Sequence, residues 1–393
     1  MINNKASNLP ADSITPKGYD PMRKWVRTGF ASLAAAIGFS AYYYTQLNPP
    51  AVFAAAASSS ATSKSLQAVI QSHLVKRESS FTITYQGSTS SLSAQMDKAV
   101  HAVLDADDSL GYTISSYRWN TSFTANAATI KVQVSYWEDA KQTAFVVNRV
   151  KQLSKQLIKP GMNEHEKVKA VHDWVILHVA YDRTLAQHSS YAALTGGSTV
   201  CQGYALLTYR LLNEAGIQNR IVEGTVSTGL HAWNLVKIGG KWYHLDTTFD
   251  DPVPDLKGRT SYNYYLLTDQ QIRRDHRWTR SYPAAVTSYG DILSMAKKTD
   301  PQKAAFYNGL EKELGYTYLK PENTVNTMEQ LQTKIEKAIQ AGKKSVTVRW
   351  TGGNRLNLQT LFDGIPVLSS IHYSQKAFAL GESGDVLLEV QFS

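Results

Sequence analysis

The chain has 393 residues, with 41 Lys and Arg against 32 Asp and Glu, and it contains a single Cys. That length predicts two or three domains. One Cys excludes an intrachain disulfide framework and any zinc site or iron–sulfur cluster that needs several cysteines of one chain. The net charge of +9 is spread along the chain, which argues against nucleic-acid binding and leaves attraction to an anionic cell wall or membrane surface open. The lone thiol is either a buried packing residue or a reactive group.

The N-terminus has the order of an export signal. Arg23, Lys24 and Arg27 precede an uncharged run over residues 28–44, and small residues follow that run. A basic, an apolar and a small-residue region in this order are typical of a secretory signal peptide, and the run also fits a short membrane anchor. We therefore predict that residues 1–54 are a signal peptide or an N-terminal membrane anchor. The rest of the chain is then secreted or lies at the cell surface.

The chain carries an internal repeat. Residues 66–87 and 331–352 align without gaps, each with helical spacing of apolar residues followed by strand-like alternation. Each copy is followed by two strand-like stretches: Tyr112–Trp119 with Thr129–Trp137, and Pro366–Tyr373 with Asp385–Phe392. We predict two similar α+β modules, residues 66–138 and 300–393, and an Ala/Ser/Thr-rich linker over residues 55–65. Chance similarity of two helix–turn–strand units is the alternative.

The middle of the chain begins with predicted helices. Asp139–Ile158 has the pattern of the first helix, and Asn163 begins a second one with a capping box. A third helix is predicted from Gln202 to Ala215, so Cys201 lies at its N-terminus. The unpaired N–H groups and the helix dipole at such a position favour a thiolate.

Two predicted strands, His231–Ile238 and Lys241–Thr247, are joined by Gly239-Gly240, which is a good signal for a two-residue hairpin loop. In the register that this loop sets, His231 and Asp246 share one face of the hairpin in diagonal positions, about 7–8 Å apart at the backbone. An imidazole and a carboxylate can bridge that distance with a hydrogen bond. A loop of one residue more or less would place them on opposite faces.

A nucleophilic thiol needs an adjacent base, and the base needs a third group that holds its tautomer. We predict Cys201 as the nucleophile, His231 as the base that later protonates the leaving group, and Asp246 as the group that orients His231. The alternatives are an inert buried thiol, a strand histidine bonded to backbone, and a turn carboxylate. No metal and no cofactor is predicted, because the other histidines lack a clean ligand spacing with a carboxylate.

Three sequence blocks resemble the core motifs of the transglutaminase-like superfamily, and most closely those of its bacterial and cytokinesis-type branch. The blocks are Val200–Ala205 (VCQGYA), His231–Asn234 (HAWN) and Trp242–Pro252 (WYHLDTTFDDP). Residues 167–182 resemble the helix before them, and Tyr264–Leu267 and Asp275–Trp278 resemble the closing segment. The resemblance implies an α+β fold in which residues 139–285 form a papain-like core. In that core, a helix that bears the Cys packs on an antiparallel sheet that bears the His and the Asp.

The resemblance also implies the chemistry. In the superfamily, such a site performs acyl transfer through a Cys thioester, from a glutamine side chain or a peptide bond to an amine or water. We expect the Cys201 N–H to be one oxyanion donor, with Tyr181, Trp174 and Gln187 as candidates for the second. Gln202 is expected at the site entrance, and Gly203 leaves room for backbone or substrate. Trp233 belongs either to the core or to an aromatic substrate groove.

The sequence therefore predicts an exported thiol enzyme that acts on protein or peptide substrates. Transamidation and hydrolysis are both left open, because the exclusion of water from the site depends on loops that sequence does not fold. The alternative from another class is a non-catalytic binding or scaffold protein of the cell envelope with a relic triad. The intact set of Cys201, His231 and Asp246 argues against that alternative.

Overall fold

In the computed structural model, the described residues are 57–123, 127–251, 253, 255, 258–353, 356–365, 367–378, 380–381 and 384–393. The predicted export segment, residues 1–54, lies outside them. No helix within these ranges is long and apolar enough to cross a membrane. The chain divides into two compact units, and the boundary between them lies between Asn234 and Leu235.

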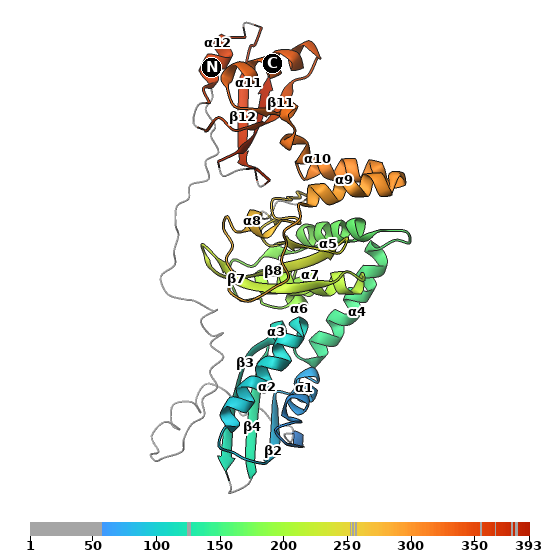
Figure 1. Cartoon of the computed structure of the whole chain (residues 1–393), viewed down its shortest axis with the longest axis vertical. Helices are drawn as coiled ribbons and strands as arrows, with labels where there is room; N and C mark the ends of the chain where they lie inside the picture. Colours follow the sequence, from blue (N-terminus) through green and yellow to red (C-terminus); the bar gives the residue numbers. More distant parts are fainter. Residues whose placement is uncertain are drawn as a thin grey trace. The chain divides into compact units, whose positions relative to one another are not determined.

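The first unit begins with a small α+β module (Figure 1). Its elements are β1 (Ala57–Ala61), α1 (Leu66–Val75), β2 (Ser80–Gln86), α2 (Leu92–Ala106), α3 (Asp108–Thr113), β3 (Ile114–Phe123) and β4 (Ala127–Tyr136). The strands lie in the order β1-β2-β4-β3. β1 runs parallel to β2, and the other two pairs are antiparallel.

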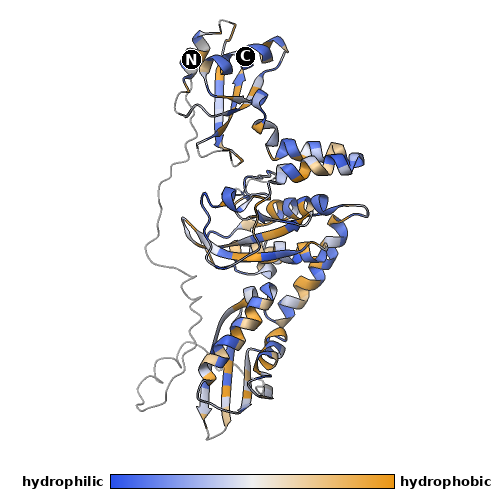
Figure 2. Cartoon of the chain, in the orientation of Figure 1, coloured by the Kyte–Doolittle hydropathy of each residue, from blue (hydrophilic) through white to orange (hydrophobic). Residues whose placement is uncertain are grey.

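Alternation of side chains explains how β2 packs in this module. Phe81, Ile83 and Tyr85 are buried, whereas Thr82 and Thr84 between them are only half-buried. Successive side chains of a strand point to opposite faces of the sheet, so the apolar face of β2 joins α1 and α2 in one core. Figure 2 shows the same mixture of hydrophobic and hydrophilic residues along the strands of the module.

One prediction for this module is wrong, and the start of one predicted strand is shifted. The predicted linker over residues 55–65 contains β1, which pairs in parallel with Phe81–Tyr85 of β2. Short Ala and Ser side chains have the composition of a linker, but backbone hydrogen bonds hold this strand, and composition does not record them. The strand predicted from Tyr112 begins two residues later, because Tyr112 belongs to α3.

The central elements follow in chain order. They are α4 (Ala140–Leu157), α5 (Glu164–His178), β5 (Ala180–Tyr181), α6 (Ser190–Gly196), β6 (Ser198–Thr199), α7 (Cys201–Glu214), β7 (Asn219–Val226), β8 (Gly229–Ile238), β9 (Lys241–Leu245) and α8 (Asp269–Ile272). The sheet order is β7-β8-β9, and the unit boundary passes through β8. The predicted helix starts are confirmed, since Asp139 and Asn163 each form a capping box with the residue three positions later.

The second unit ends in another small α+β module. Its elements, with the helices that precede it, are α9 (Tyr289–Thr299), η2 (Pro301–Lys303), α10 (Ala304–Glu313), η3 (Tyr316–Leu319), η4 (Pro321–Asn323), β10 (Thr324–Val325), α11 (Met328–Gln340), β11 (Ser345–Trp350), α12 (Leu358–Asp363), β12 (Ile371–Ala377) and β13 (Val386–Phe392). The strand order is β10-β11-β13-β12, again with one parallel pair followed by two antiparallel pairs. The two modules therefore share one sheet topology. The strand predicted to start at Pro366 begins later, at Ile371.

A buried ion pair joins the N-terminal module to the central helices within the first unit. Glu138 lies between β4 and α4 and is 0% exposed. Arg210 of α7 donates Nη1 to both carboxylate oxygens of Glu138, at 2.7 and 3.0 Å, and the N–H of Tyr191 donates to Oε2 at 2.9 Å. A buried charge of this kind is tolerated only when it is paired and hydrogen-bonded.

We expect Glu138→Gln to lower the free energy of unfolding by about 3 kcal/mol, because it leaves the Arg210 guanidinium without its counter-ion in a buried place. The measurement is urea denaturation followed by tryptophan fluorescence. Lys169→Met is the control, since it removes a partly exposed ion pair with Asp173 and should cost less than about 1 kcal/mol. Equal losses for the two variants would contradict the structural role of Glu138.

Candidate active site

The helix α7 places the single Cys. Cys201 is the first residue of α7 and is 6% exposed. Its N-cap residue is Val200, which has no polar side chain to occupy the N–H groups at this helix start. The thiol therefore lies where helix N–H groups and the helix dipole favour negative charge, as the sequence predicts.

A small parallel ladder and a loop carbonyl hold the segment before the Cys. Ala180 pairs with Ser198, and Tyr181 pairs with Thr199. The carbonyl oxygen of Gln187 accepts hydrogen bonds from the Val200 N–H at 2.8 Å and from Thr199 Oγ1 at 3.0 Å. The position of Cys201 thus depends on the loop that carries Gln187.

Asp182 organises that loop. Its Oδ1 accepts from the N–H and the hydroxyl of Thr184 at 2.9 and 2.6 Å, and its Oδ2 accepts from the N–H groups of Ala186 and Gln187, both at 2.8 Å. Burial alone would raise the pKa of Asp182, but these hydrogen bonds hold it below its ordinary value. The ionised carboxylate therefore fixes the loop in one conformation.

Tyr181 interacts electrostatically with Cys201. Burial is the main cause that raises the pKa of Tyr181 to about 12, and the negative charges of Cys201 and Asp182 add to the increase. Tyr181 is therefore protonated at neutral pH. It can donate a hydrogen bond beside the thiol.

Gly203 and Gln202 make packing contacts. A Cβ on Gly203 would lie 2.0 Å from Oγ1 of Thr199, so the close approach of protein backbone and side chain requires glycine there. Gln202 is buried and donates its Nε2 to the carbonyl oxygen of Tyr112 at 2.7 Å. This hydrogen bond anchors the Gln202 side chain to the N-terminal module. The sequence instead predicts this side chain at the entrance of the site.

His231 lies on β8, and its ring stacks on Trp233 with centroids 5.8 Å apart and planes 19° from parallel. Trp233 is 1% exposed and so belongs to the core, which was one of its two expected places. The next residue, Asn234, donates Nδ2 to the carbonyl oxygen of Ala205 at 3.0 Å. That bond ties β8 to α7, the helix that begins with Cys201.

The turn after β8 has the predicted form, with Gly239 and Gly240 at φ values of 57° and 76°. Two positive φ values in a two-residue loop are the type I′ geometry. Strand β9 ends one residue before Asp246, so the Asp follows the strand instead of lying in it as predicted. Its Oδ1 accepts from the N–H groups of Thr248 and Phe249 at 2.9 and 3.1 Å.

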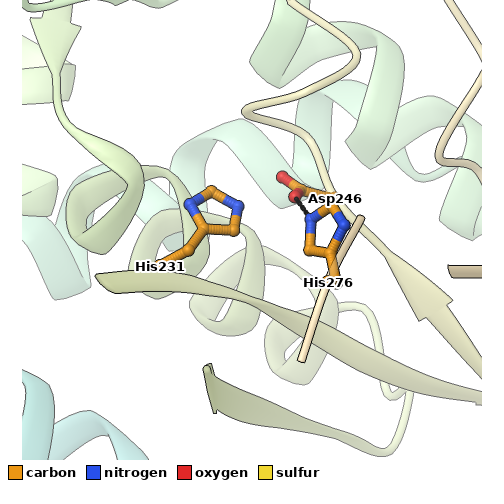
Figure 3. Close-up of side chains that lie close together, drawn as sticks. All are labelled: His231, Asp246 and His276. Atoms are coloured by element: carbon orange, nitrogen blue, oxygen red, sulfur yellow. Dashed lines mark hydrogen bonds and ion pairs between the residues drawn. The ribbon is translucent and has the colours of Figure 1, made fainter. Parts of the chain in front are cut away.

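Asp246 lies between two histidines (Figure 3). One nitrogen or oxygen atom from each of His231, Asp246 and His276 lies within 4.8 Å of the other two. Among the described residues this is the only group of three or more His, Cys, Asp or Glu side chains that is spaced closely enough to share a metal ion. The contact between His276 and Asp246 is a hydrogen bond, with Nε2 of His276 3.0 Å from Oδ2 of Asp246.

His276 is a site residue that sequence reasoning missed. Its second ring nitrogen, Nδ1, is 2.6 Å from Oδ1 of Asp275. The only sequence signal for either residue is its place in the block that resembles the closing segment of the superfamily. The structure thus adds His276 and Asp275 to the group that contains His231 and Asp246.

The sequence pattern of the Transglutaminase-like superfamily core matches residues 151–247. The kyphoscoliosis peptidase of Mus musculus is 28% identical over 185 residues, which are 42% of this chain and 28% of that protein. The kyphoscoliosis peptidase of Homo sapiens is 27% identical over 179 residues, 40% of this chain and 27% of that protein. The chain therefore spans only about a quarter of the length of these curated relatives.

Two solved structures are also similar. A TGase is 15% identical over 43% of this chain and 51% of its own, with a TM-score of 0.23. A protein of Cytophaga hutchinsonii with a provisional description as a cysteine protease is 18% identical over 42% of this chain and 73% of its own, with a TM-score of 0.24. By its sequence motifs and its mixed α+β core, the central segment is a transglutaminase-like domain. Residues 151–247 therefore carry the sequence pattern of a transglutaminase-like core.

We expect Asp182→Asn to lower the free energy of unfolding by about 2 kcal/mol at pH 7, because an amide nitrogen cannot accept the hydrogen bonds that one carboxylate oxygen accepts. The folded pKa of Asp182 lies below the unfolded value of about 3.9. Its contribution is therefore complete above that pH and is lost as the pH falls through the folded pKa. Denaturation at pH 7, 5 and 3 should show a constant difference from wild type between pH 7 and 5 and a smaller one at pH 3.

The exposed Asp105 supplies the matched control, since Asp105→Asn should change stability by less than about 0.5 kcal/mol at each pH. A difference for Asp182→Asn that does not shrink at pH 3 would show that the lost contribution does not depend on the ionised carboxylate.

Proposed function

We propose that this chain is a thiol enzyme that transfers acyl groups of protein or peptide substrates through a thioester on Cys201. The observation that carries the proposal is the group of His231 and Asp246 in a chain whose single Cys begins a helix. The membership of the central segment in the transglutaminase-like superfamily supports it. The order of basic, apolar and small residues before residue 55 supports action outside the cytoplasm.

The proposed reaction has two halves. His231 takes the proton of Cys201, and the sulfur attacks the carbonyl carbon of an amide. The carbon–nitrogen bond breaks, His231 gives its proton to the leaving amine, and a thioester remains. Water or an amine then loses a proton to His231 and attacks the thioester. The carbon–sulfur bond breaks, and His231 returns that proton to the sulfur, so that the thiol is restored. Asp246 holds the His231 ring in the tautomer and orientation that both halves need.

The developing oxyanion needs hydrogen-bond donors. The backbone N–H of Cys201 is one, and the protonated hydroxyl of Tyr181 is our candidate for the other. For the acceptor, the name of the curated relatives favours water, since both are called peptidases. We therefore place hydrolysis before transamidation.

The function is tested by incubating the chain with a peptide library, with and without a labelled primary amine. New peptide termini support hydrolysis, and incorporated amine supports transamidation. We expect Cys201→Ala, His231→Gln and Asp246→Asn each to lower the rate at least about 10³-fold. His372→Gln, on the exposed part of β12, should leave it unchanged. The proposal is wrong if neither product forms and iodoacetamide fails to alkylate Cys201 at neutral pH; a non-catalytic binding protein would then be the better description.

Tyr181→Phe separates the oxyanion role from thiol activation. Since it removes one donor to the oxyanion, we expect kcat/KM to fall about 10²-fold. Alkylation by iodoacetamide forms no oxyanion, so its rate should change less than about threefold. Tyr373→Phe in β12 is the control for loss of a hydroxyl. An unchanged kcat/KM would remove Tyr181 from the oxyanion site.

A further inference from the structure

His276 is fully buried at 0% exposure and has an aspartate at each ring nitrogen. Nε2 lies 3.0 Å from Oδ2 of Asp246, and Nδ1 lies 2.6 Å from Oδ1 of Asp275. Both distances are short enough for hydrogen bonds, and each contact is an ion pair when the ring is protonated. The ring therefore bridges the proposed catalytic carboxylate and a second one.

The number of protons follows from this geometry. An ionised carboxylate can only accept a hydrogen bond, whereas a neutral imidazole has a single N–H to donate. Two hydrogen bonds to two carboxylates therefore require a proton on both ring nitrogens. We propose that His276 is held as an imidazolium between Asp246 and Asp275, as a positioning residue that fixes the orientation of Asp246 and balances its charge. This inference rests on the proposed function, because it assigns His276 its role through Asp246.

The surroundings of Asp275 favour its ionised form. The hydroxyl of Tyr264 donates to Oδ2 of Asp275, while His276 lies at Oδ1. Burial alone would raise the pKa of Asp275, but the hydrogen bonds from His276 and Tyr264 hold it below its ordinary value. Asp275 is thus a carboxylate that supports a positive charge on the ring.

Two aromatic rings confine the imidazole. Phe249 meets the His276 ring edge to face, with centroids 4.8 Å apart, and Tyr264 lies tilted to it at 5.4 Å. Faces of aromatic rings attract cations, so this packing is compatible with an imidazolium. The N–H of the same Phe249 donates to Oδ1 of Asp246, so both Asp246 oxygens are fixed by one local structure.

Other ionisable groups also act on His276 or on its partners. His244 interacts electrostatically with His276, and burial is the main cause that lowers the pKa of His244, with the charge of His276 adding to it. Asp269 lies 2.8 Å from Nε2 of His244, and Arg274 interacts electrostatically with Asp275. With Asp246 and Asp275 in direct contact, two carboxylates outweigh these more distant groups, and the net field at the ring favours the cation.

The positive charge has a consequence for the thiol. An imidazolium beside Asp246 partly balances the negative charge that Asp246 presents to His231. Without it, the region of His231 and Cys201 becomes more negative, and both groups hold their protons to higher pH. The pH dependence of Cys201 alkylation reports this without a known substrate.

The first experiment uses the full wild-type chain labelled with ¹⁵N at histidine. At pH 8 we expect the ring of His276 to show two N–H groups, with the signals assigned by their loss in His276→Gln. A ring with one N–H that titrates near the ordinary value of about 6.5 overturns the proposed imidazolium. In Asp275→Asn, at a partly exposed position, we expect the ring to lose its second proton at lower pH. This variant decides the matter if His276→Gln does not fold.

The second experiment measures iodoacetamide alkylation of Cys201 between pH 5 and 10. In His276→Gln we expect the acid and the alkaline limb of the pH–rate profile both to shift to higher pH by about one unit. The alkylation rate on the acid side then falls about tenfold. A purely structural role would lower stability and leave the limbs in place, which would overturn the positioning role. His372→Gln should match wild type. If wild-type Cys201 is inert but the His276 ring carries two N–H groups, the proposed function fails while the clamped imidazolium stands.

Discussion

The Asp246 carboxylate is held through both of its oxygens, and the geometry of the candidate site depends on that. Backbone N–H groups of Thr248 and Phe249 fix Oδ1, and the ring of His276 fixes Oδ2. A carboxylate with both oxygens engaged cannot rotate, so the local structure sets its orientation. The two-glycine turn between β8 and β9 sets how far along the hairpin the Asp stands from the His.

Two other buried carboxylates, Glu138 and Asp182, are likewise held by hydrogen-bond donors. Glu138 joins the N-terminal module to α7 through Arg210, and Asp182 holds the loop behind the Cys through backbone N–H groups. Each is charged, buried and supplied with donors, which is the condition under which a buried charge is stable. In this chain the positions of Cys201 and Asp246 thus depend on polar contacts as well as on apolar packing.

Local rules predicted a large part of this arrangement. A capping box at Asn163 predicted one helix start, because the cap and its partner are only three residues apart. The helix expected from Asp139 also begins with a capping box in the structure. The alternation of strand side chains and a two-residue loop put His231 and Asp246 on one face. The linker prediction failed at β1, because a strand of Ala and Ser is held by backbone partners that its composition does not reveal.

The sequence by itself determined the single thiol at a helix start and the two-glycine turn that brings the segments of His231 and Asp246 together, since each follows from a local period or a short loop. Only the tertiary structure decided that His276 meets Asp246 from 30 residues away, and that Gln202 turns to Tyr112 from 90 residues away. Hydrogen bonds between distant segments leave no periodic trace in a sequence. They depend on how the segments pack, and the packing is a property of the folded chain as a whole.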